Sequence, residues 1–181
     1  MNEPAHHLQF QRLREPNPEI AAALERWAND PELVPFMRPS RSRQELEEPV
    51  KITPETLAAR LQQHPIYLIY AEGNLVGEMN YQIDPDHLYR KIPGTAWVGI
   101  TIGDRSAWGR GIGTRAMRFL EERIREAGCL RIELGVFEFN TRAQHLYRKL
   151  GYREIGRIDQ FTFWKGKMWQ DIRMEKLISR I

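Results

Sequence analysis

GITIGDRSAWGRGIGTRAM, residues 99–117, contains three glycines within five positions, in a turn that separates two regular elements. Before this turn, the β-branched and aromatic run TAWVGITI predicts a strand over 95–102. After the turn, apolar residues recur at the spacing of an amphipathic helix. These residues are Ala116, Met117, Leu120 and Ile124. Small residues at a helix N-terminus let main-chain amides approach an anion, so the order of strand, turn and helix indicates a pyrophosphate site.

The glycines alone leave a second interpretation open, because glycines also serve tight turns that bind nothing. Two better-known phosphate motifs do not fit the stretch. The dinucleotide fingerprint requires G-x-G-x-x-G in a parallel β-α-β unit followed by an acidic residue. The Walker motif requires a lysine, which this turn lacks. Arg110 offers a cation within the turn that would add to an anion site.

A second segment, NTRAQHLYRKLGY at 140–152, predicts a helix that Asn140 caps and Gly151 ends. Asn140 and Tyr147 are about two helical turns apart, so both can lie along one face with Ala143 between them. That placement suits joint action on a ligand. The alternative interpretation is structural: Asn140 is then only an N-cap, and Tyr147 is a core residue with its hydroxyl at the surface.

The remaining periodicity predicts strands and helices around these two motifs. Strands are expected at 8–15, 66–71, 75–83, 130–137, 152–158 and 168–177, and helices at 19–28 and 53–64. Residues 38–52 are predicted to be a long loop, because they are polar and interrupted by prolines. Antiparallel hairpins and crossover helices are mixed, so we expect an α/β (α+β) fold with helices on both faces of a mixed sheet. Because no repeat or linker interrupts the sequence, residues 1–181 are expected to form a single domain.

Composition places the chain among globular proteins and argues against several other classes. Of 181 residues, 41% are hydrophobic and 28% are charged, and no apolar run approaches the ~18 residues that span a bilayer. The 27 basic and 24 acidic residues are interspersed, unlike a nucleic-acid-binding patch. A lone Cys129 excludes an internal disulfide and the first residues lack a leader pattern, so a cytoplasmic protein is expected. The histidines lack metal-ligand spacing, and no metal is expected.

Together and in this order, the two motifs resemble the GNAT superfamily of acetyl-CoA-dependent N-acetyltransferases, and the resemblance extends through nearly the whole chain. Residues 99–117 are similar to the family's fourth strand and its coenzyme A pyrophosphate loop, and 140–152 to its later asparagine, tyrosine and Gly-aromatic pattern. Residues 11–33 are most similar to the branch of ribosomal-protein alanine acetyltransferases. The resemblance implies a mostly antiparallel central sheet flanked by helices. One departure is Trp108, where the family commonly has Gln or Arg.

The resemblance also implies how acetyl-CoA would be bound. Backbone amides from Arg110 through Thr114 would hold the pyrophosphate, and Ile100 to Ile102 would offer strand-edge groups to the pantetheine arm. Tyr147 would protonate the departing thiolate, and Asn140 would orient the coenzyme or a water molecule. The implied cofactor-binding set is Ile100, Thr101, Ile102, Trp108, Gly109, Arg110, Gly111, Ile112, Gly113, Thr114, Asn140, Ala143 and Tyr147.

The acceptor needs a base, because a primary amine is mostly protonated at neutral pH. Family members often have a Glu on the fourth strand, but TAWVGITI contains none, so that role does not carry over. Glu78 and Glu138, at predicted strand positions facing the opened sheet, are the substitutes, although each also suits an ordinary exposed carboxylate. His87 and His145 also titrate near neutrality, and His145 is expected at the surface.

The function that follows is direct transfer of an acetyl group from acetyl-CoA to a primary amine in a ternary complex. A small-molecule amine such as a polyamine, an aminoglycoside and a protein amino terminus are all open as acceptors, and loops 38–53 and 83–94 are expected to select among them. Acidic residues in these loops suit a cationic acceptor, but also an ordinary solvated loop. They are Glu45, Glu47, Glu48, Asp84 and Asp86. A catalytically silent acyl-CoA-binding sensor is the alternative. The oligomeric state is open, with a homodimer the commonest assembly.

Overall fold

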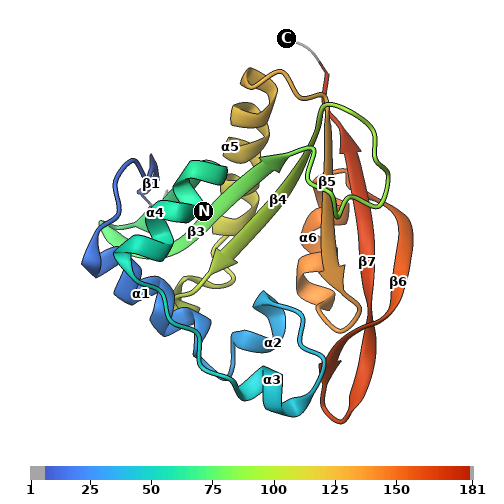
Figure 1. Ribbon diagram of the computed structural model, residues 1–181. Helices are drawn as coiled ribbons and strands as arrows, with labels where there is room; N and C mark the ends of the chain where they lie inside the picture. Colours follow the sequence, from blue (N-terminus) through green and yellow to red (C-terminus); the bar gives the residue numbers. More distant parts are fainter. Residues whose placement is uncertain (1–6, 180–181) are drawn as a thin grey trace, which may run out of the picture.

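Seven strands form one sheet within residues 7–179, the part of the chain that the computed structural model describes (Figure 1). The strands are β1 (Leu8–Arg12), β2 (Ile66–Ala71), β3 (Asn74–Ile83), β4 (Thr95–Ile102), β5 (Arg131–Phe137), β6 (Arg153–Trp164) and β7 (Lys167–Leu177). Their spatial order is β1-β2-β3-β4-β5-β7-β6. Every neighbouring pair is antiparallel except β4 and β5, which are parallel. The expectation of a mixed, mostly antiparallel sheet is confirmed.

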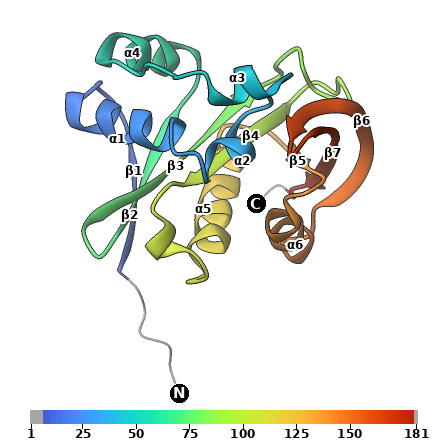
Figure 2. The same ribbon diagram turned by 90° about the horizontal axis from the view of Figure 1, so that it is seen from below.

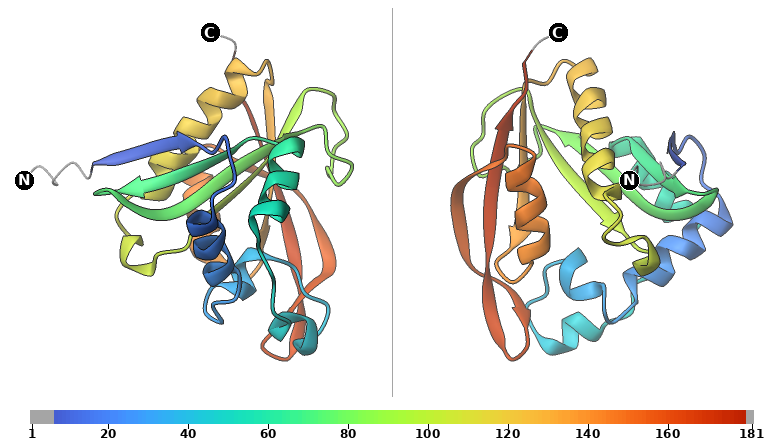
Figure 3. Two further views of the ribbon diagram at one scale, coloured as in Figure 1. Left: turned by 60° about the vertical axis from the view of Figure 1, so that its left-hand side comes forward. Right: turned by 180° about the vertical axis from the view of Figure 1, so that it is seen from behind.

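Helices cover both faces of this sheet, as expected. They are α1 (Pro18–Ala28), α2 (Val34–Met37), α3 (Arg43–Glu47), α4 (Pro54–Gln63), α5 (Ile112–Glu126) and α6 (Thr141–Lys149). Helices α5 and α6 lie on one face, and α1 and α4 lie on the other (Figures 2 and 3). The short helix α2 lies near the end of β5, and the short helix α3 lies beside β6. No helix within residues 7–179 is long and apolar enough to cross a membrane.

Local sequence explains where the predicted helices begin. The side chain of Asn17 caps α1 by accepting hydrogen bonds from the backbone amides of Glu19 and Ile20, at 2.8 and 3.3 Å. At the start of α4, Thr53 and Thr56 form a reciprocal capping box, in which each side chain accepts a hydrogen bond from the other's backbone amide. These caps satisfy amides that have no partner inside the helix.

Two apolar clusters bury the inner faces of the helices. The apolar positions of α5 that the sequence singles out are fully enclosed in the cluster on its side of the sheet. The second cluster lies between the sheet and the pair α1 and α4, and it includes Leu24, Trp27, Leu57 and Leu68. Burial on both faces fixes the sheet between its helices, as the α+β pattern requires.

The prediction of a structureless loop over 38–52 is wrong in part, because α3 lies inside it. This helix has only five residues and none of them is buried, so it has no apolar period that the sequence could reveal. Ser42 caps it by accepting a hydrogen bond from the backbone amide of Glu45 at 3.2 Å. The run ELVPFM, which the sequence leaves unassigned, contains α2.

The strand predicted at 152–158 is also longer than expected and continues as β6 to Trp164. Strands β6 and β7 pair on both sides of an irregularity between Ile158 and Thr162. Gln160 lies in this irregularity with a φ of 50°. The polar residues at this irregularity interrupt the alternation of apolar and polar side chains, so the sequence pattern did not reveal the second half of the strand.

Candidate functional site

Strands β4 and β5 separate after a short parallel ladder. Their pairs are Thr95 with Arg131, Ala96 with Ile132 and Trp97 with Glu133, and the ladder ends there. Beyond it, β4 stays paired with β3 and β5 stays paired with β7 to the ends of the strands. The two strands therefore diverge (Figure 1), and residues 98–102 face 134–137 across a widening gap. Such edges present backbone donors and acceptors that an extended ligand can pair with.

The glycine turn lies between the end of β4 and the start of α5. Gly109 and Gly111 have φ values of 73° and 71°, in the left-handed region that favours glycine. Gly111 is the N-cap of α5, and no side chain caps this helix. A Cβ on Gly113 would lie 3.1 Å from Leu146 Cδ2, so the turn packs closely against α6. A helix N-terminus without a side-chain cap, approached by small residues, is suited to an anion.

Trp108 links the turn to both neighbouring elements. Its indole Nε1 donates a hydrogen bond to the carbonyl oxygen of Ile102 at 2.8 Å, which fixes the end of β4. The Arg142 guanidinium at the start of α6 lies 5.0 Å from the centroid of the Trp108 ring. The residue that departs from the family pattern thus has a structural role, because it fastens β4, the turn and α6 to one another.

Asn140 and Tyr147 lie at the start of α6 and two turns along it. The Asn140 Oδ1 atom accepts a hydrogen bond from the backbone amide of Ala143 at 3.2 Å, so the predicted N-cap is present. Tyr147 is only 8% exposed, and its ring lies 5.9 Å from that of Tyr152. Burial raises the pKa of Tyr147 to about 12. The hydroxyl is more enclosed than the surface position that the structural interpretation of the sequence expected.

Polar side chains line one face of β3, the strand next to β4. Glu78, Asn80 and Gln82 alternate along β3 and are half-buried. Glu78 lies opposite Thr101, and both of its carboxylate oxygens accept hydrogen bonds from Nη2 of Arg60, at 3.0 and 3.2 Å. The structure thus places Glu78, one of the two predicted bases, on the face of the sheet that α4 covers, where Arg60 already neutralises its charge.

Glu138 lies in a turn, so the prediction that it occupies a strand position is wrong. The chain leaves β5 at Phe137 because it must enter α6 at Asn140. The Glu138 Oε2 atom accepts a hydrogen bond from the backbone amide of Gln170 at 3.2 Å, and the Glu138 amide donates to the Gln170 carbonyl oxygen at 3.0 Å. This carboxylate fastens the end of β5 to β7.

Asp171 was not predicted, yet it lies beside the point where the strands separate. A Cβ on Gly135, in the part of β5 that no longer pairs with β4, would lie 2.6 Å from Asp171 Oδ2 and 3.0 Å from Trp97 Cη2. Asp171 is 2% exposed and its Oδ2 accepts a hydrogen bond from Nε of Arg173 at 2.7 Å. Burial raises the pKa of Asp171 against the opposing effect of Arg173. The signal for it was in the sequence, because Asp171, Arg173 and Glu175 alternate with apolar residues.

Aromatic side chains gather between α2, the β5–α6 turn and the β6–β7 hairpin. Phe139 is central: its ring centroid lies 4.3 Å from that of Trp164, 5.4 Å from Trp169 and 5.5 Å from Phe36. The hairpin also brings lysine ammonium groups onto the indole faces, at 4.3 Å for Lys165 on Trp164 and 3.7 Å for Lys167 on Trp169. Sequence reasoning missed this aromatic wall, because its members lie far apart along the chain.

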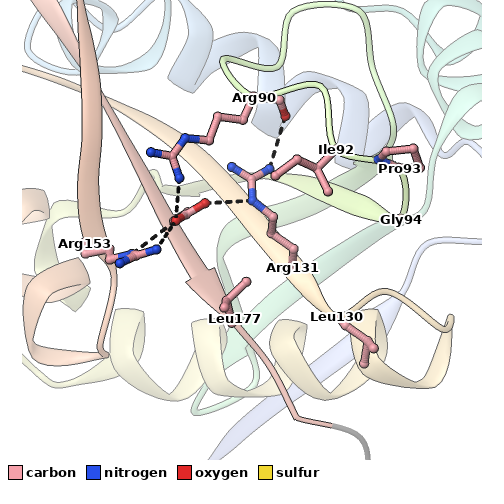
Figure 4. Close-up of a pocket in the computed structure, with 9 residues that line it drawn as sticks. Arg90, Ile92, Pro93, Gly94, Leu130, Arg131, Arg153 and Leu177 are labelled. Atoms are coloured by element: carbon pink, nitrogen blue, oxygen red, sulfur yellow. Dashed lines mark hydrogen bonds and ion pairs between the residues drawn. The ribbon is translucent and has the colours of Figure 1, made fainter.

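A cavity of about 330 Å³ lies at the other end of the sheet, where β4 and β5 begin (Figure 4). Its charged lining converges on Glu175, whose carboxylate accepts hydrogen bonds from Arg131 Nε at 2.8 Å, Arg90 Nη1 at 3.1 Å and Arg153 Nη2 at 2.7 Å. These ion pairs join β5, β6, β7 and the β3–β4 loop to one another at the end of the sheet opposite the gap. Within residues 7–179, no group of three His, Cys, Asp or Glu side chains is placed to hold a metal ion.

Comparison with known proteins adds the family. The model of the acetyltransferase (GNAT) family matches residues 20–152. A spermine/spermidine N(1)-acetyltransferase of Bacillus subtilis is 32% identical over 92 residues, which cover 50% of this chain and 60% of that protein, so the match spans less than two thirds of the relative's length.

Solved structures share the fold over nearly the whole chain. A ribosomal-protein-alanine N-acetyltransferase from Brucella melitensis has a TM-score of 0.73 at 20% identity and covers 94% of this chain and 99% of its own. A spermidine N-acetyltransferase from Vibrio cholerae, solved with CoA and spermine, has a TM-score of 0.72 at 19% identity and covers 96% of both chains.

Proposed function

Because the chain belongs to the acetyltransferase (GNAT) family, we propose that it transfers the acetyl group of acetyl-CoA directly to the nitrogen of a primary amine. The observation that carries this proposal is the separation of β4 and β5 beyond Trp97 and Glu133, with the glycine turn at the end of β4. An acyl-pantetheine arm is extended and rich in amide groups, so it can pair with a free strand edge. The gap and the turn together suit both ends of one coenzyme.

In this proposal the pyrophosphate lies on the amides of residues 110–114, and the pantetheine arm runs along residues 98–102 of β4. A main-chain amide of β4 then donates to the thioester oxygen as negative charge develops on it, which stabilises the transition state. The contacts of Trp108 hold the turn and the strand end in a fixed relation, so neither has to be ordered when the coenzyme binds.

Tyr147 gives its proton to the coenzyme thiolate as the C–S bond breaks, and Asn140 orients the coenzyme from the start of α6. A pKa of about 12 keeps the Tyr147 phenol protonated throughout the neutral range, so the donor is always in its acid form. The capping bond of Asn140 uses its oxygen atom. Its side-chain nitrogen is the group that this role requires.

The acceptor is a primary amine, and the relatives support a polyamine within this class. Proteins named for acetylation of spermine or spermidine appear among both the sequence relatives and the solved structures. The acidic loop residues do not add to this argument, because several have local partners. Glu47 pairs with Arg43 at 2.9 Å, and the Asp84 carboxylate accepts hydrogen bonds from the backbone amides of Gly94 and Thr95.

The test is release of free thiol from acetyl-CoA when the purified protein meets spermine, a peptide with an N-terminal alanine or an aminoglycoside. Thiol release that depends on the amine, with one acetylated product per thiol, is the expected result. Coenzyme binding without acetylation of any of these amines would instead favour the silent acyl-CoA sensor. If the protein binds neither CoA nor acetyl-CoA in calorimetry, both proposals are wrong.

A further inference from the structure

Buried charges fasten the loop between β3 and β4, residues 84–94, to the sheet. The carboxylate of Glu133, which is completely buried, accepts hydrogen bonds from the backbone amides of Tyr89 and Arg90. From the neighbouring strand β7, Nη1 of Arg173 donates to the carbonyl oxygen of His87 at 2.8 Å. Loops rarely have their backbone held by enclosed ionised side chains, because removing a charge from water is costly.

The same loop is held at two more points. Arg131 Nη1 donates to the carbonyl oxygen of Arg90 at 3.3 Å. The Tyr89 ring packs where Gly156 leaves room in β6: a Cβ on that glycine would lie 2.2 Å from Tyr89 Cζ. The loop therefore extends over β5 and β7 as far as β6 and contacts all three strands. These contacts fix the position of its backbone.

One of those side chains is His87, which the loop places at the point where β4 and β5 separate. Its ring meets that of Trp97 edge to face, with centroids 4.6 Å apart. Trp97 is the last residue of β4 that pairs with β5, and its indole reaches across to Gly135, beyond the end of that ladder on β5. The imidazole therefore packs against the residue at which the gap between β4 and β5 begins. His87 is an exposed residue.

Charged groups from three elements surround this imidazole. Partial burial of the imidazole lowers the pKa of His87 and the nearby Arg173 of β7 lowers it further, whereas Glu133 of β5 and Asp86 of the loop itself oppose the shift. The net direction is downward from the ordinary value, so the ring is neutral at pH 7 and has a lone pair to offer.

We propose that His87 is the general base that removes the proton of the acceptor ammonium. This inference rests on the proposed acetyl transfer. The ammonium gives one proton to His87, the freed amine attacks the thioester carbon, the C–N bond forms and the C–S bond breaks. The thiolate takes a proton from Tyr147, the nitrogen's second proton restores the phenol through solvent, and His87 releases its proton to solvent.

The carboxylates near the gap fit this role less well than His87. Glu78 is held by Arg60 through both oxygens, and Asp171 is enclosed and bound by Arg173. A carboxylate whose oxygens are occupied by a guanidinium is not free to accept the proton of a substrate, and a carboxylate as enclosed as Asp171 is poorly placed to meet a substrate nitrogen. The exposed imidazole beside Trp97 has neither restriction.

The test compares kcat/KM across pH for the full chain and for His87→Gln, with spermine, an alanyl peptide and phenethylamine as acceptors. With His87 the protonated amine is deprotonated on the enzyme, so kcat/KM should be flat from about pH 7 up to the amine pKa, which is about 10 for a primary alkylamine and about 8 for the amino terminus of the alanyl peptide. Without it only the free amine reacts, so with spermine or phenethylamine the variant should lose ~10²-fold at pH 7 and recover about tenfold per pH unit, whereas with the alanyl peptide the recovery should end near pH 8. His7→Gln, at the exposed residue just before β1, is the matched control and should keep the wild-type profile.

A loss for His87→Gln that stays constant across pH would mean that His87 is only a structural residue, and this inference would be wrong. A variant within about threefold of wild type at pH 7 would overturn it as well, since a general base contributes far more. If the wild-type protein acetylates none of the three amines, the proposed function itself fails, which is a result distinct from an altered pH profile.

Discussion

The Tyr147 side chain is 8% exposed, and its burial keeps the phenol in the protonated form that a proton donor needs. Its pKa of about 12 means that the phenol is protonated when the thiolate departs; because a thiolate is a weaker base than this phenolate, the transfer is completed only as the nitrogen's second proton restores the phenol. Its ring also packs against Tyr152. A substitution that removes only the hydroxyl can therefore distinguish its contribution from that of the ring.

Tyr147→Phe keeps the ring and removes only the hydroxyl. We expect acetyl-CoA affinity to stay nearly constant while the chemical step slows by ~10²–10⁴-fold, the usual contribution of a general acid. Single-turnover kinetics should accompany steady-state rates, because product release can hide a slower chemical step. A chemical step within about twofold of wild type would assign Tyr147 to packing alone.

A substitution at Gly111 tests whether the turn after β4 binds the pyrophosphate. Nothing lies within 4 Å of a Cβ at this position, but its φ of 71° is unfavourable for a β-branched residue, and a side chain there would stand over the helix N-terminus. Gly111→Val should therefore sharply weaken coenzyme A binding in calorimetry. Gly128→Val is the matched control, because Gly128 has a φ of 88° and equal space at the far end of α5. Equal affinities in the two folded variants would remove the pyrophosphate from this turn.

At the scale of elements, the sequence predicted the features that depend on residues close together in the chain. The hairpin of β2 and β3, the strand before the glycine turn and the cap of α6 at Asn140 all follow from neighbours within a few residues. Helix α3 was missed because it buries nothing. Glu138 was placed in a strand because the end of β5 depends on where α6 must begin.

The α6 cap gives a prediction at this scale. Asn140→Ala removes the side-chain acceptor of the Ala143 amide and should lower the free energy of unfolding by about 1 kcal/mol, measured in urea. Asn140→Ser restores a capping oxygen and should recover most of that stability. If Asn140 also orients the coenzyme, Ser will recover stability without recovering turnover. Full recovery of both would limit Asn140 to its capping role.

At the scale of the whole molecule, the sheet order brings together residues that no local pattern connects. Trp97, Gly135 and Asp171 come from three strands and meet only because β5 lies between β4 and β7. His87 reaches the same place because buried side chains of β5 and β7 hold its loop. Periodicity assigns each of these residues to an element, but their contacts depend on strand order and register, which the sequence alone did not define.

Amide hydrogen exchange with and without coenzyme A tests the central claim, that the gap between β4 and β5 and the turn after β4 hold the coenzyme. Amides of residues 98–102 and 110–114 should gain strong protection when coenzyme A is added, because the ligand pairs with the strand edge and covers the helix N-terminus. Amides of β1, four strands along the sheet order from β5, should exchange unchanged. Protection that leaves residues 98–102 and 110–114 unaffected while coenzyme A binds would contradict the account.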